Sequence, residues 1–215
     1  EVDRQTEVFL SDELRRALPN SGFAGEEFGR SSDGDRYVWV CDPIDGTTNF
    51  VRGLPHWCVS VGLLDGGEPV MGVVFAPALD TTYAAYAGGG AWRDGVRIAC
   101  LAPTVLEYED LVCVSTNALK TLNLSRLVTR LRCLGSIALE TCLVAEGRVV
   151  ASVGIGEGIH DLAASLCITR EACAATTYLD GRVLDPAKLL QDWRTTEHFI
   201  TASEPVRELV RRAAI

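Results

Sequence analysis

The sequence lacks long apolar runs, and it has few basic residues for its acidic content. No apolar run approaches the ~20 residues that a membrane-spanning helix needs, so we expect no membrane association. Against 29 Asp and Glu the 215 residues contain only 20 Lys and Arg, and the formal net charge is -9. This balance argues against nucleic acid as a partner, because nucleic-acid-binding proteins usually present a basic face. A small phosphorylated substrate stays compatible with it, since bound divalent cations can reverse a local acidic field.

The sequence also lacks any CxxC pair, although it has eight cysteines. Most of them stand in apolar contexts such as "LVCVS" and "LETCLV", which favours buried, reduced thiols. A zinc site and a disulfide framework are the alternatives. Reduced thiols and the absence of a visible secretory signal predict a cytoplasmic protein. The chain begins at Glu1 without an initiator Met, so a segment ahead of it stays open.

The apolar pattern predicts a mixed α/β chain without repeats. Residues 1–18 read as a helix, "RYVWVCD" as a buried strand that ends at Asp42, and residues 56–98 as a meander of strands. A change of pattern after Pro103 suggests two subdomains, 1–103 and 104–215. In the second half we expect strands in "EDLVCVST", "RCLGS", "RVVASVG" and "EHFITAS", a hairpin or turn in "TTYLDGRVLD", and helices in "LKTLNLSRLVTRL", "SIALETCLVAEG", "IHDLAASLCITREAC" and "EPVRELVRRAAI".

The stretch "CDPIDGTTNF" at residues 41–50 has two readings. Pro and Asp-Gly make turns, so a D-P-x-D-G stretch can be a turn and nothing more. The same stretch can also hold a hard cation, because Asp42, Asp45 and the Ile44 carbonyl offer the oxygen ligands that Mg²⁺ prefers. Gly46 would let the backbone turn around the ion, and amides after it would point at a phosphate.

Three further acidic positions each have an ordinary explanation. "GEE" at 25–27 fits a solvated loop, Asp161 fits the N-cap of the helix that follows it, and Asp3 fits a surface charge on the first helix. Their significance comes from their occurrence together with "CDPIDGTTNF" in one chain.

Together these motifs resemble the inositol monophosphatase family. "WVCDPIDGTTNFVRGLPHWCVSVGL" at 39–63 is similar to its signature, "EVDRQTE" to its first helix, and "GEE", "GSIALE" and "HDLAASLCITREAC" to further elements. The resemblance implies a layered α/β/α/β/α sandwich of the sugar-phosphatase type and a cytoplasmic, lithium-sensitive, Mg²⁺-dependent phosphomonoesterase that is commonly a homodimer. It also implies that a family member has a further N-terminal segment ahead of Glu1.

The resemblance implies a role for each motif residue. Glu26, Asp42 and the Ile44 carbonyl would hold one Mg²⁺, and Asp42, Asp45 and Asp161 a second, with a third, weaker ion near Glu26. The attacking water would be oriented by Asp3 and Thr47. The substrate would contact Asp45, the amides of Gly46 and Thr47, and the backbone of Gly135, Ser136 and Ile137.

Three positions depart from the family pattern. His160 stands where the family has Trp, either as a tolerated exchange or with a direct role in substrate or metal binding. Gly154 stands seven residues before Asp161, where the family has an inositol-binding Glu, and Glu157 lies out of register. Cys173 and Ala174 replace two glycines; if that turn needs a positive φ they strain it, and we expect local rearrangement rather than lost chemistry.

The sequence therefore predicts hydrolysis of a small phosphate monoester, with inositol monophosphate first. Three other phosphate esters are alternative substrates for the same site: histidinol phosphate, fructose 1,6-bisphosphate and 3′-phosphoadenosine 5′-phosphate. A non-catalytic binder that keeps the fold is the alternative of a different class.

Overall fold

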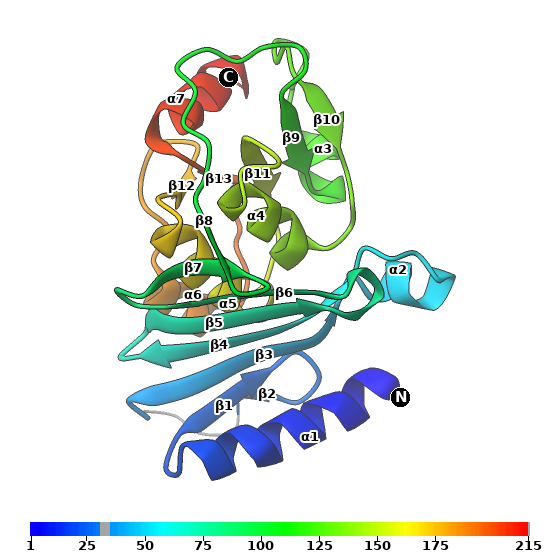
Figure 1. The fold of residues 1–215 in the computed structure, drawn as a ribbon, viewed down its shortest axis with the longest axis vertical. Helices are drawn as coiled ribbons and strands as arrows, with labels where there is room; N and C mark the ends of the chain where they lie inside the picture. The colour runs from blue at the N-terminus through cyan, green and yellow to red at the C-terminus, as the bar shows by residue number, and fades with distance from the viewer. Residues whose placement is uncertain (31–34, 215) are drawn as a thin grey trace.

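The computed structural model describes residues 1–30 and 35–214, and these form stacked layers of helices and sheets (Figure 1). Within the described residues there are seven α-helices: α1 (Val2–Ala17), α2 (Thr47–Arg52), α3 (Thr116–Thr121), α4 (Ile137–Ala145), α5 (Ile159–Glu171), α6 (Pro186–Asp192) and α7 (Glu204–Ala214). A short 3-10 turn, η1, covers Pro77–Leu79. No helix in this described part of the chain is long and apolar enough to cross a membrane.

The first sheet has eight strands in the order β2-β1-β3-β4-β5-β6-β7-β8 over the described residues. They are β1 (Gly22–Gly25), β2 (Gly29–Arg30), β3 (Tyr37–Asp45), β4 (Cys58–Asp65), β5 (Glu68–Ala76), β6 (Thr81–Tyr86), β7 (Gly90–Arg93) and β8 (Val96–Ile98). Only β1 and β3 run parallel to each other, and the remaining pairs are antiparallel. The predicted meander is confirmed, because consecutive strands from β4 to β8 pair antiparallel through short connections. Glycine-containing turns form these connections except between β5 and β6, which η1 joins.

The second sheet is built from the later part of the chain. Its five strands within the described residues run in the order β10-β9-β11-β13-β12. They are β9 (Leu111–Val114), β10 (Arg130–Arg132), β11 (Ala151–Gly154), β12 (Ala175–Tyr178) and β13 (Phe199–Ala202). Since β9, β10 and β11 are parallel while β13 is antiparallel to β11 and β12, the sheet is mixed.

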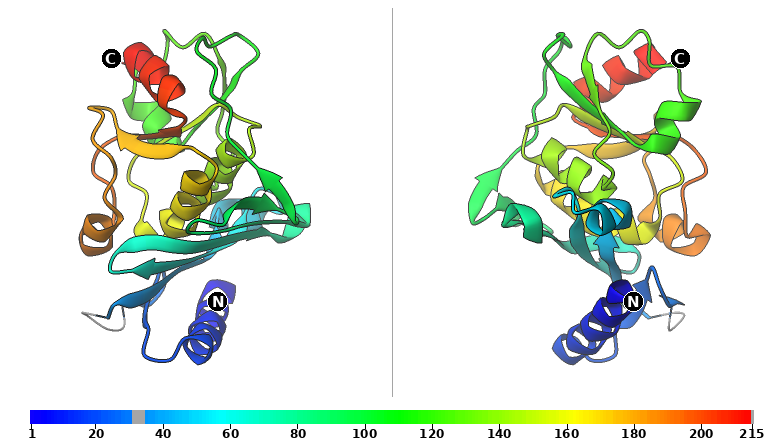
Figure 2. Two further views of the ribbon diagram at one scale, coloured as in Figure 1. Left: turned by 60° about the vertical axis from the view of Figure 1, so that its left-hand side comes forward. Right: turned by 90° about the vertical axis from the view of Figure 1, so that its right-hand side faces the viewer.

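Helices cover both faces of both sheets. α1 packs on β1 and β3 from the outside, α4 and α5 lie between the sheets, and side chains of α3 and α7 join the apolar cluster on the far face of the second sheet. Figure 2 shows α1 and α7 at opposite ends of this stack in both views. The predicted α/β/α/β/α sandwich is confirmed. The division into units 1–103 and 104–215 stays a prediction. α5, from the second half of the chain, packs against the first sheet, so contacts cross this boundary.

Two glycines let α5 lie directly on the first sheet. A β-carbon at Gly62 would stand 2.8 Å from the β-carbon of Ala163, and one at Gly72 would stand 2.2 Å from the carbonyl oxygen of Ala164. Any larger residue at either position would push the helix away. This close approach brings the N-terminus of α5 to the end of β3, where the motif of residues 41–50 lies.

Several predicted elements differ from the structure. The helix expected in "LKTLNLSRLVTRL" is wrong: α3 ends at Thr121, and Leu122 already has an extended backbone. The side chain of Asn123 accepts hydrogen bonds from the amide and hydroxyl of Ser125, so a local turn replaces the helix. The strand expected in "RCLGS" lies earlier, at β10. α6 was missed within a segment of turns, although Asp185 caps it and Pro186 is its first residue.

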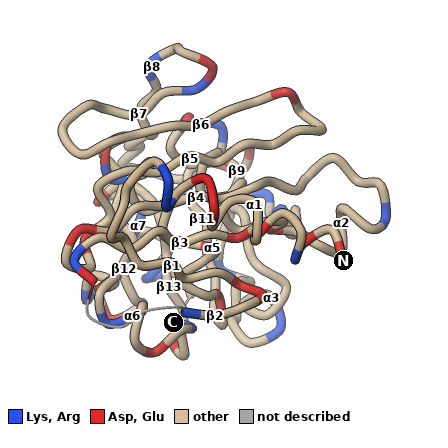
Figure 3. Tube along the Cα trace, turned by 90° about the horizontal axis from the view of Figure 1, so that it is seen from below, with Lys and Arg blue, Asp and Glu red and all other residues tan. Residues whose placement is uncertain are grey.

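The eight cysteines are all free thiols. Five of them are buried: Cys41, Cys58, Cys113, Cys142 and Cys167. Seen from below the first sheet, Lys and Arg are scattered along the trace rather than gathered on one element (Figure 3). This distribution agrees with the absence of a basic face in the sequence.

Candidate metal centre and substrate cavity

A bulge in β3 aims Asp42 and Asp45 to the same side. Asp42 pairs with Ser60 of β4 and Asp45 pairs with Cys58, so β3 has three steps where β4 has two. In a regular strand, residues three apart point to opposite faces. The extra residue, which lies in the Pro43–Ile44 segment, cancels that alternation. The stretch is therefore a bulged strand end that brings two carboxylates together, which is compatible with the metal-site interpretation.

Asp45 is fixed by the start of α4. Its Oδ2 accepts hydrogen bonds from Ser136 Oγ and from the amide of Ala138, both at 2.7 Å. Ser136 is also the N-cap of α4, because its hydroxyl accepts a bond from the Leu139 amide. "GSIALE" therefore orients one carboxylate of the "DPID" stretch across 91 residues of sequence.

The turn after Asp45 requires glycine. Gly46 has φ +91°, and a β-carbon there would lie 3.0 Å from the carbonyl oxygen of His56 and 3.1 Å from that of Gly135. Asn49 holds the turn closed, since its Nδ2 donates to the His56 and Leu134 carbonyls at 2.6 Å each. The residues predicted to contact the substrate, Gly46 and Gly135–Ile137, are thus adjacent in space.

Asp161 completes a cluster with these two carboxylates. The expectation that Asp161 is the N-cap of α5 is wrong, because Gly158 occupies that position. The Asp161 carboxylate accepts a hydrogen bond from the Gly158 amide at 2.5 Å. Carboxylate oxygens of Asp42, Asp45 and Asp161 lie within 4.8 Å of one another, and all three residues are buried. Three buried like charges this close repel strongly, whereas a divalent cation with oxygen ligands would stabilise them. The donor set therefore fits Mg²⁺.

Burial dominates the electrostatics of this cluster. It raises the pKa of Asp42 well above its ordinary value, and the charges of Asp45 and Asp161 raise it further. Burial likewise raises the pKa of Asp45, where the bonds from Ser136 and Ala138 act in the opposite direction. Without a cation, the raised pKa values of Asp42 and Asp45 favour the protonated form of these two carboxyls.

Glu26 follows β1 and adds a fourth carboxylate at the edge of the cluster. One of its oxygens lies within 4.8 Å of ligand atoms of Asp42 and His160. Burial raises the pKa of Glu26, and the charge of Asp161 raises it again. This position fits the role that the resemblance implies for Glu26.

α1 supports the "GEE" segment. The Glu7 carboxylate accepts hydrogen bonds from the amides of Glu27 at 2.8 Å and Phe28 at 3.0 Å. One helical turn earlier on the same face, Asp3 Oδ1 is buried with no hydrogen-bond partner within the described residues. Thr47, by contrast, is exposed, and its hydroxyl donates to the Ile44 carbonyl at 2.9 Å. No contact between Asp3 and Thr47 is recorded within the described chain, so their shared role stays a prediction.

A cavity of about 200 Å³ opens beside Asp45. Its walls come from Gly135–Ile137, the start of α3 at Ser115–Asn117, Glu140 and Glu157. The sequence reasoning missed Ser115–Asn117 and Glu140. Glu140 is the only charged residue of α4, a helix buried along most of its length, and this was a signal of function that the sequence contained. One of its oxygens accepts bonds from the Leu134 and Gly135 amides, while Oε2 is buried without a partner among residues 1–30 and 35–214.

Glu157 supplies a carboxylate that the seven-residue count from Asp161 did not find. Gly154 lies within β11, where a β-carbon would meet the Phe199 ring at 2.5 Å, so a side chain there would enter the core. The loop before α5 instead carries Glu157 into the cavity wall. Burial, followed by the charge of Asp161, raises the pKa of Glu157 to about 7.

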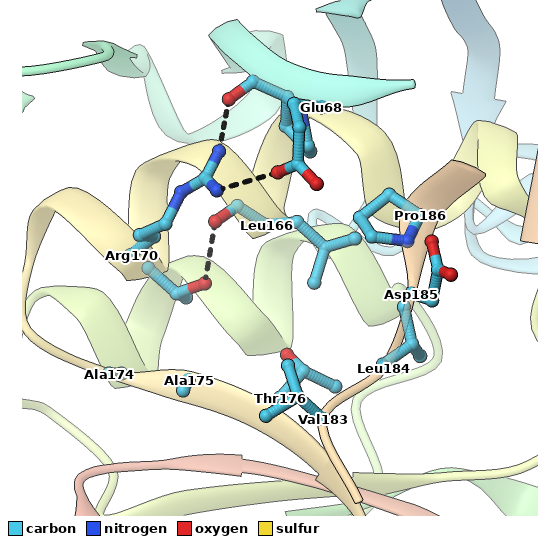
Figure 4. A pocket seen from close by; sticks show the side chains of 12 residues that line it. Glu68, Leu166, Arg170, Ala174, Ala175, Thr176, Val183, Leu184, Asp185 and Pro186 are labelled. Carbon is cyan, nitrogen blue, oxygen red and sulfur yellow. Dashed lines mark hydrogen bonds and ion pairs between the residues drawn. The ribbon is translucent and has the colours of Figure 1, made fainter. Parts of the chain in front are cut away.

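A second cavity, of about 330 Å³, lies between the end of α5 and β12 (Figure 4). Its charged side chains are all engaged. Arg170 pairs with Glu68 at 3.0 Å and donates to the Pro69 carbonyl, and Asp185 accepts bonds from the Ala187 and Lys188 amides. With its one cation paired, this cavity offers little to a phosphate, and the cavity beside Asp45 remains the candidate.

Known proteins share this arrangement. Residues 1–208 match the model of the inositol monophosphatase family. The "Fructose-1,6-bisphosphatase/inositol-1-monophosphatase" of Thermotoga maritima is 38% identical, over 85% of this chain and 72% of that protein. The "Histidinol-phosphatase" of Mycobacterium tuberculosis is also 38% identical, over 84% of this chain and 74% of its own length. The structure of an inositol monophosphatase from Anabaena (Nostoc) sp. PCC 7120 superposes with a TM-score of 0.86 at 28% identity, covering 98% of this chain and 84% of that one.

Proposed function

The chain belongs to the inositol monophosphatase family, whose members are metal-dependent phosphatases, and we propose that it hydrolyses inositol monophosphate. The observation that carries the proposal is the cluster of Asp42, Asp45 and Asp161 beside a cavity lined by Glu140 and Glu157. The cluster supports a Mg²⁺-dependent phosphomonoesterase. The cavity supports an alcohol with several hydroxyl groups, because carboxylate oxygens accept hydrogen bonds from them.

Each residue of the site would have a separate task. Asp42, Asp45, Asp161, Glu26 and the Ile44 carbonyl would hold two or three Mg²⁺ ions. Bound there, Mg²⁺ would neutralise the phosphoryl oxygens and lower the pKa of a bound water.

The remaining residues would bind the substrate and position the water. Thr47 and Asp3 would orient the attacking water, with Asp3 as the acceptor of its proton. The amides of Gly46 and Thr47 would bind the phosphate, and Glu157 with the backbone of Gly135–Ile137 would bind the alcohol. In-line displacement would follow from these fixed positions.

The charge of the cavity favours a second candidate, a phosphorylated amino alcohol such as histidinol phosphate. Among the described residues, its lining side chains include Asp45, Glu140 and Glu157 and no Lys or Arg. An ammonium group would therefore be attracted to the cavity, whereas the second phosphate of fructose 1,6-bisphosphate or 3′-phosphoadenosine 5′-phosphate would be repelled.

Phosphate release from these four esters, with Mg²⁺ and with EDTA, tests the proposal. We expect Mg²⁺-dependent turnover of inositol 1-phosphate and a loss of more than about a hundredfold in kcat for Asp45→Asn, since Asp45 would hold a catalytic ion. Exposed Asp192→Asn is the matched control and should leave the rate unchanged. Preference for histidinol phosphate would select the second candidate. No release from any ester, with Mg²⁺ still bound, would favour the non-catalytic alternative.

A further inference from the structure

His160 is a buried imidazole beside the carboxylate cluster. It is the second residue of α5, and 1% of it is exposed. Its ring offers a nitrogen that lies, with one carboxylate oxygen each of Glu26 and Asp42, in a group whose members are all within 4.8 Å of one another. Two atoms bound to the same ion at about 2.1 Å stand up to about 4.2 Å apart, so small side-chain rotations bring these three to one ion.

Neither ring nitrogen of His160 has a hydrogen-bond partner within residues 1–30 and 35–214. A buried imidazole normally donates or accepts at one nitrogen at least, because an unsatisfied polar group costs about 1–3 kcal/mol. The nearest charged oxygen, Asp161 Oδ2, lies 3.6 Å from Nε2 and already accepts the Gly158 amide. A ligand bound beside Glu26 and Asp42 would remove this cost.

Packing holds the ring in place. Trp193 contacts one side of it with ring centroids 5.6 Å apart. On the other side the ring covers Gly158 so closely that a β-carbon there would meet Cε1 at 2.2 Å. The imidazole is therefore positioned before any ligand arrives, which lowers the cost of binding.

We propose that Glu26, Asp42 and His160 form a mixed nitrogen and oxygen site that binds Co²⁺ or Zn²⁺ more tightly than Mg²⁺. Imidazole suits these borderline ions, whereas Mg²⁺ prefers oxygen ligands alone. Because Asp42 and Glu26 are also proposed Mg²⁺ ligands, a Co²⁺ or Zn²⁺ ion here would compete with the oxygen-only centre. The inference rests on the proposed metal cluster but does not require turnover.

Metal binding without substrate tests the proposal. Calorimetric titrations with Co²⁺ and with Mg²⁺ should be made on the wild-type chain and on His160→Phe and His160→Gln, each first melted in EDTA to verify folding. We expect Co²⁺ to bind about tenfold more weakly or worse in both variants and Mg²⁺ to bind as before. His198→Gln, at a half-buried position outside the carboxylate cluster, is a matched control and should bind both ions as the wild type does.

A spectroscopic measurement identifies the ligand directly. His56→Gln with His198→Gln leaves His160 as the last of the three histidines. Pulsed electron paramagnetic resonance of Cu²⁺ bound to that double variant should show coupling to a remote imidazole nitrogen, and His160→Phe should abolish it. Unchanged Co²⁺ affinity in the His160 variants, or absence of the nitrogen coupling, would overturn the proposal. Absence of phosphatase activity in the wild type, with both the His160-dependent Co²⁺ affinity and the nitrogen coupling observed, would instead count against the proposed function alone.

Discussion

At the scale of single residues, Glu157 titrates in the range where the protein would work. Its pKa is raised from 4.5 to about 7, chiefly by burial. The folded chain therefore keeps a proton that the unfolded chain releases between these values, and the free energy of unfolding falls as pH rises through this window. Above pH 7 the residue is ionised in both states, and the whole penalty applies.

Glu157→Gln should remove this penalty. In metal-free protein at pH 8 we expect the variant to be more stable than the wild type by on the order of 2 kcal/mol, and to be about equally stable at pH 4. Urea unfolding at the two pH values measures the difference. Glu107→Gln, at an exposed position, is the matched control. Equal stability of variant and wild type at both pH values would show that folding does not raise the pKa of Glu157.

The same scale shows what the sequence could and could not predict about the site. The motif around Asp42 and Asp45 predicted a converging pair, and the structure brings Asp161 to it from a distant helix. Counting seven residues back from Asp161 leads to Gly154 in β11, whereas the loop between β11 and α5 carries Glu157 into the cavity wall. Glu140 was missed although it is the only charged residue in an apolar segment, because its place in the cavity wall depends on how α4 packs.

At the scale of elements, the apolar spacing of residues 119–131 predicted a helix, but most of this segment has another backbone conformation. Leu124, Leu127 and Leu131 do pack into one core cluster, as the helical spacing required. Leu124 and Leu127 reach it from an irregular segment, because the Asn123 side chain competes with the helix for local amide bonds, and Leu131 reaches it from β10. The periodicity therefore predicted the buried residues better than it predicted the secondary structure.

The turn after α5 contains Cys173 and Ala174, which were expected to strain it if it needs a positive φ. Cys173 has φ +67°, a conformation that costs a residue with a β-carbon about 1–2 kcal/mol. Cys173→Gly should raise the stability by about 1 kcal/mol at most, since the greater freedom of glycine in the unfolded chain offsets part of the gain. Cys173→Ala keeps the β-carbon and should gain nothing. Thermal unfolding of both variants measures the effect, and equal melting temperatures would mean that the turn is unstrained.

At the scale of the whole molecule, the carboxylate cluster joins layers that are far apart in sequence. Asp42 and Asp45 end a strand of the first sheet, Asp161 begins a helix between the sheets, and Glu26 lies beside the outer helix. In the metal-free protein, Asp42 and Asp45 lower the stability of the fold, because each buried carboxyl is either charged beside its acidic neighbours or protonated at a cost. A cation that binds only the folded arrangement must therefore stabilise the entire fold by mass action.

This coupling predicts opposite effects of Asp42→Asn with and without metal. In EDTA the variant should melt at a higher temperature than the wild type, because a neutral amide replaces a buried carboxyl that is either charged or protonated at a cost. With Mg²⁺ at about a hundred times its dissociation constant, the wild type should gain about 2.7 kcal/mol and the variant much less, so their order reverses. Asp192→Asn should follow the wild type under both conditions, since that residue is exposed. Scanning calorimetry in EDTA and across a Mg²⁺ series measures all three chains. If Mg²⁺ stabilised Asp42→Asn as much as the wild type, Asp42 would not be a ligand, and the cluster would be acidic for another reason.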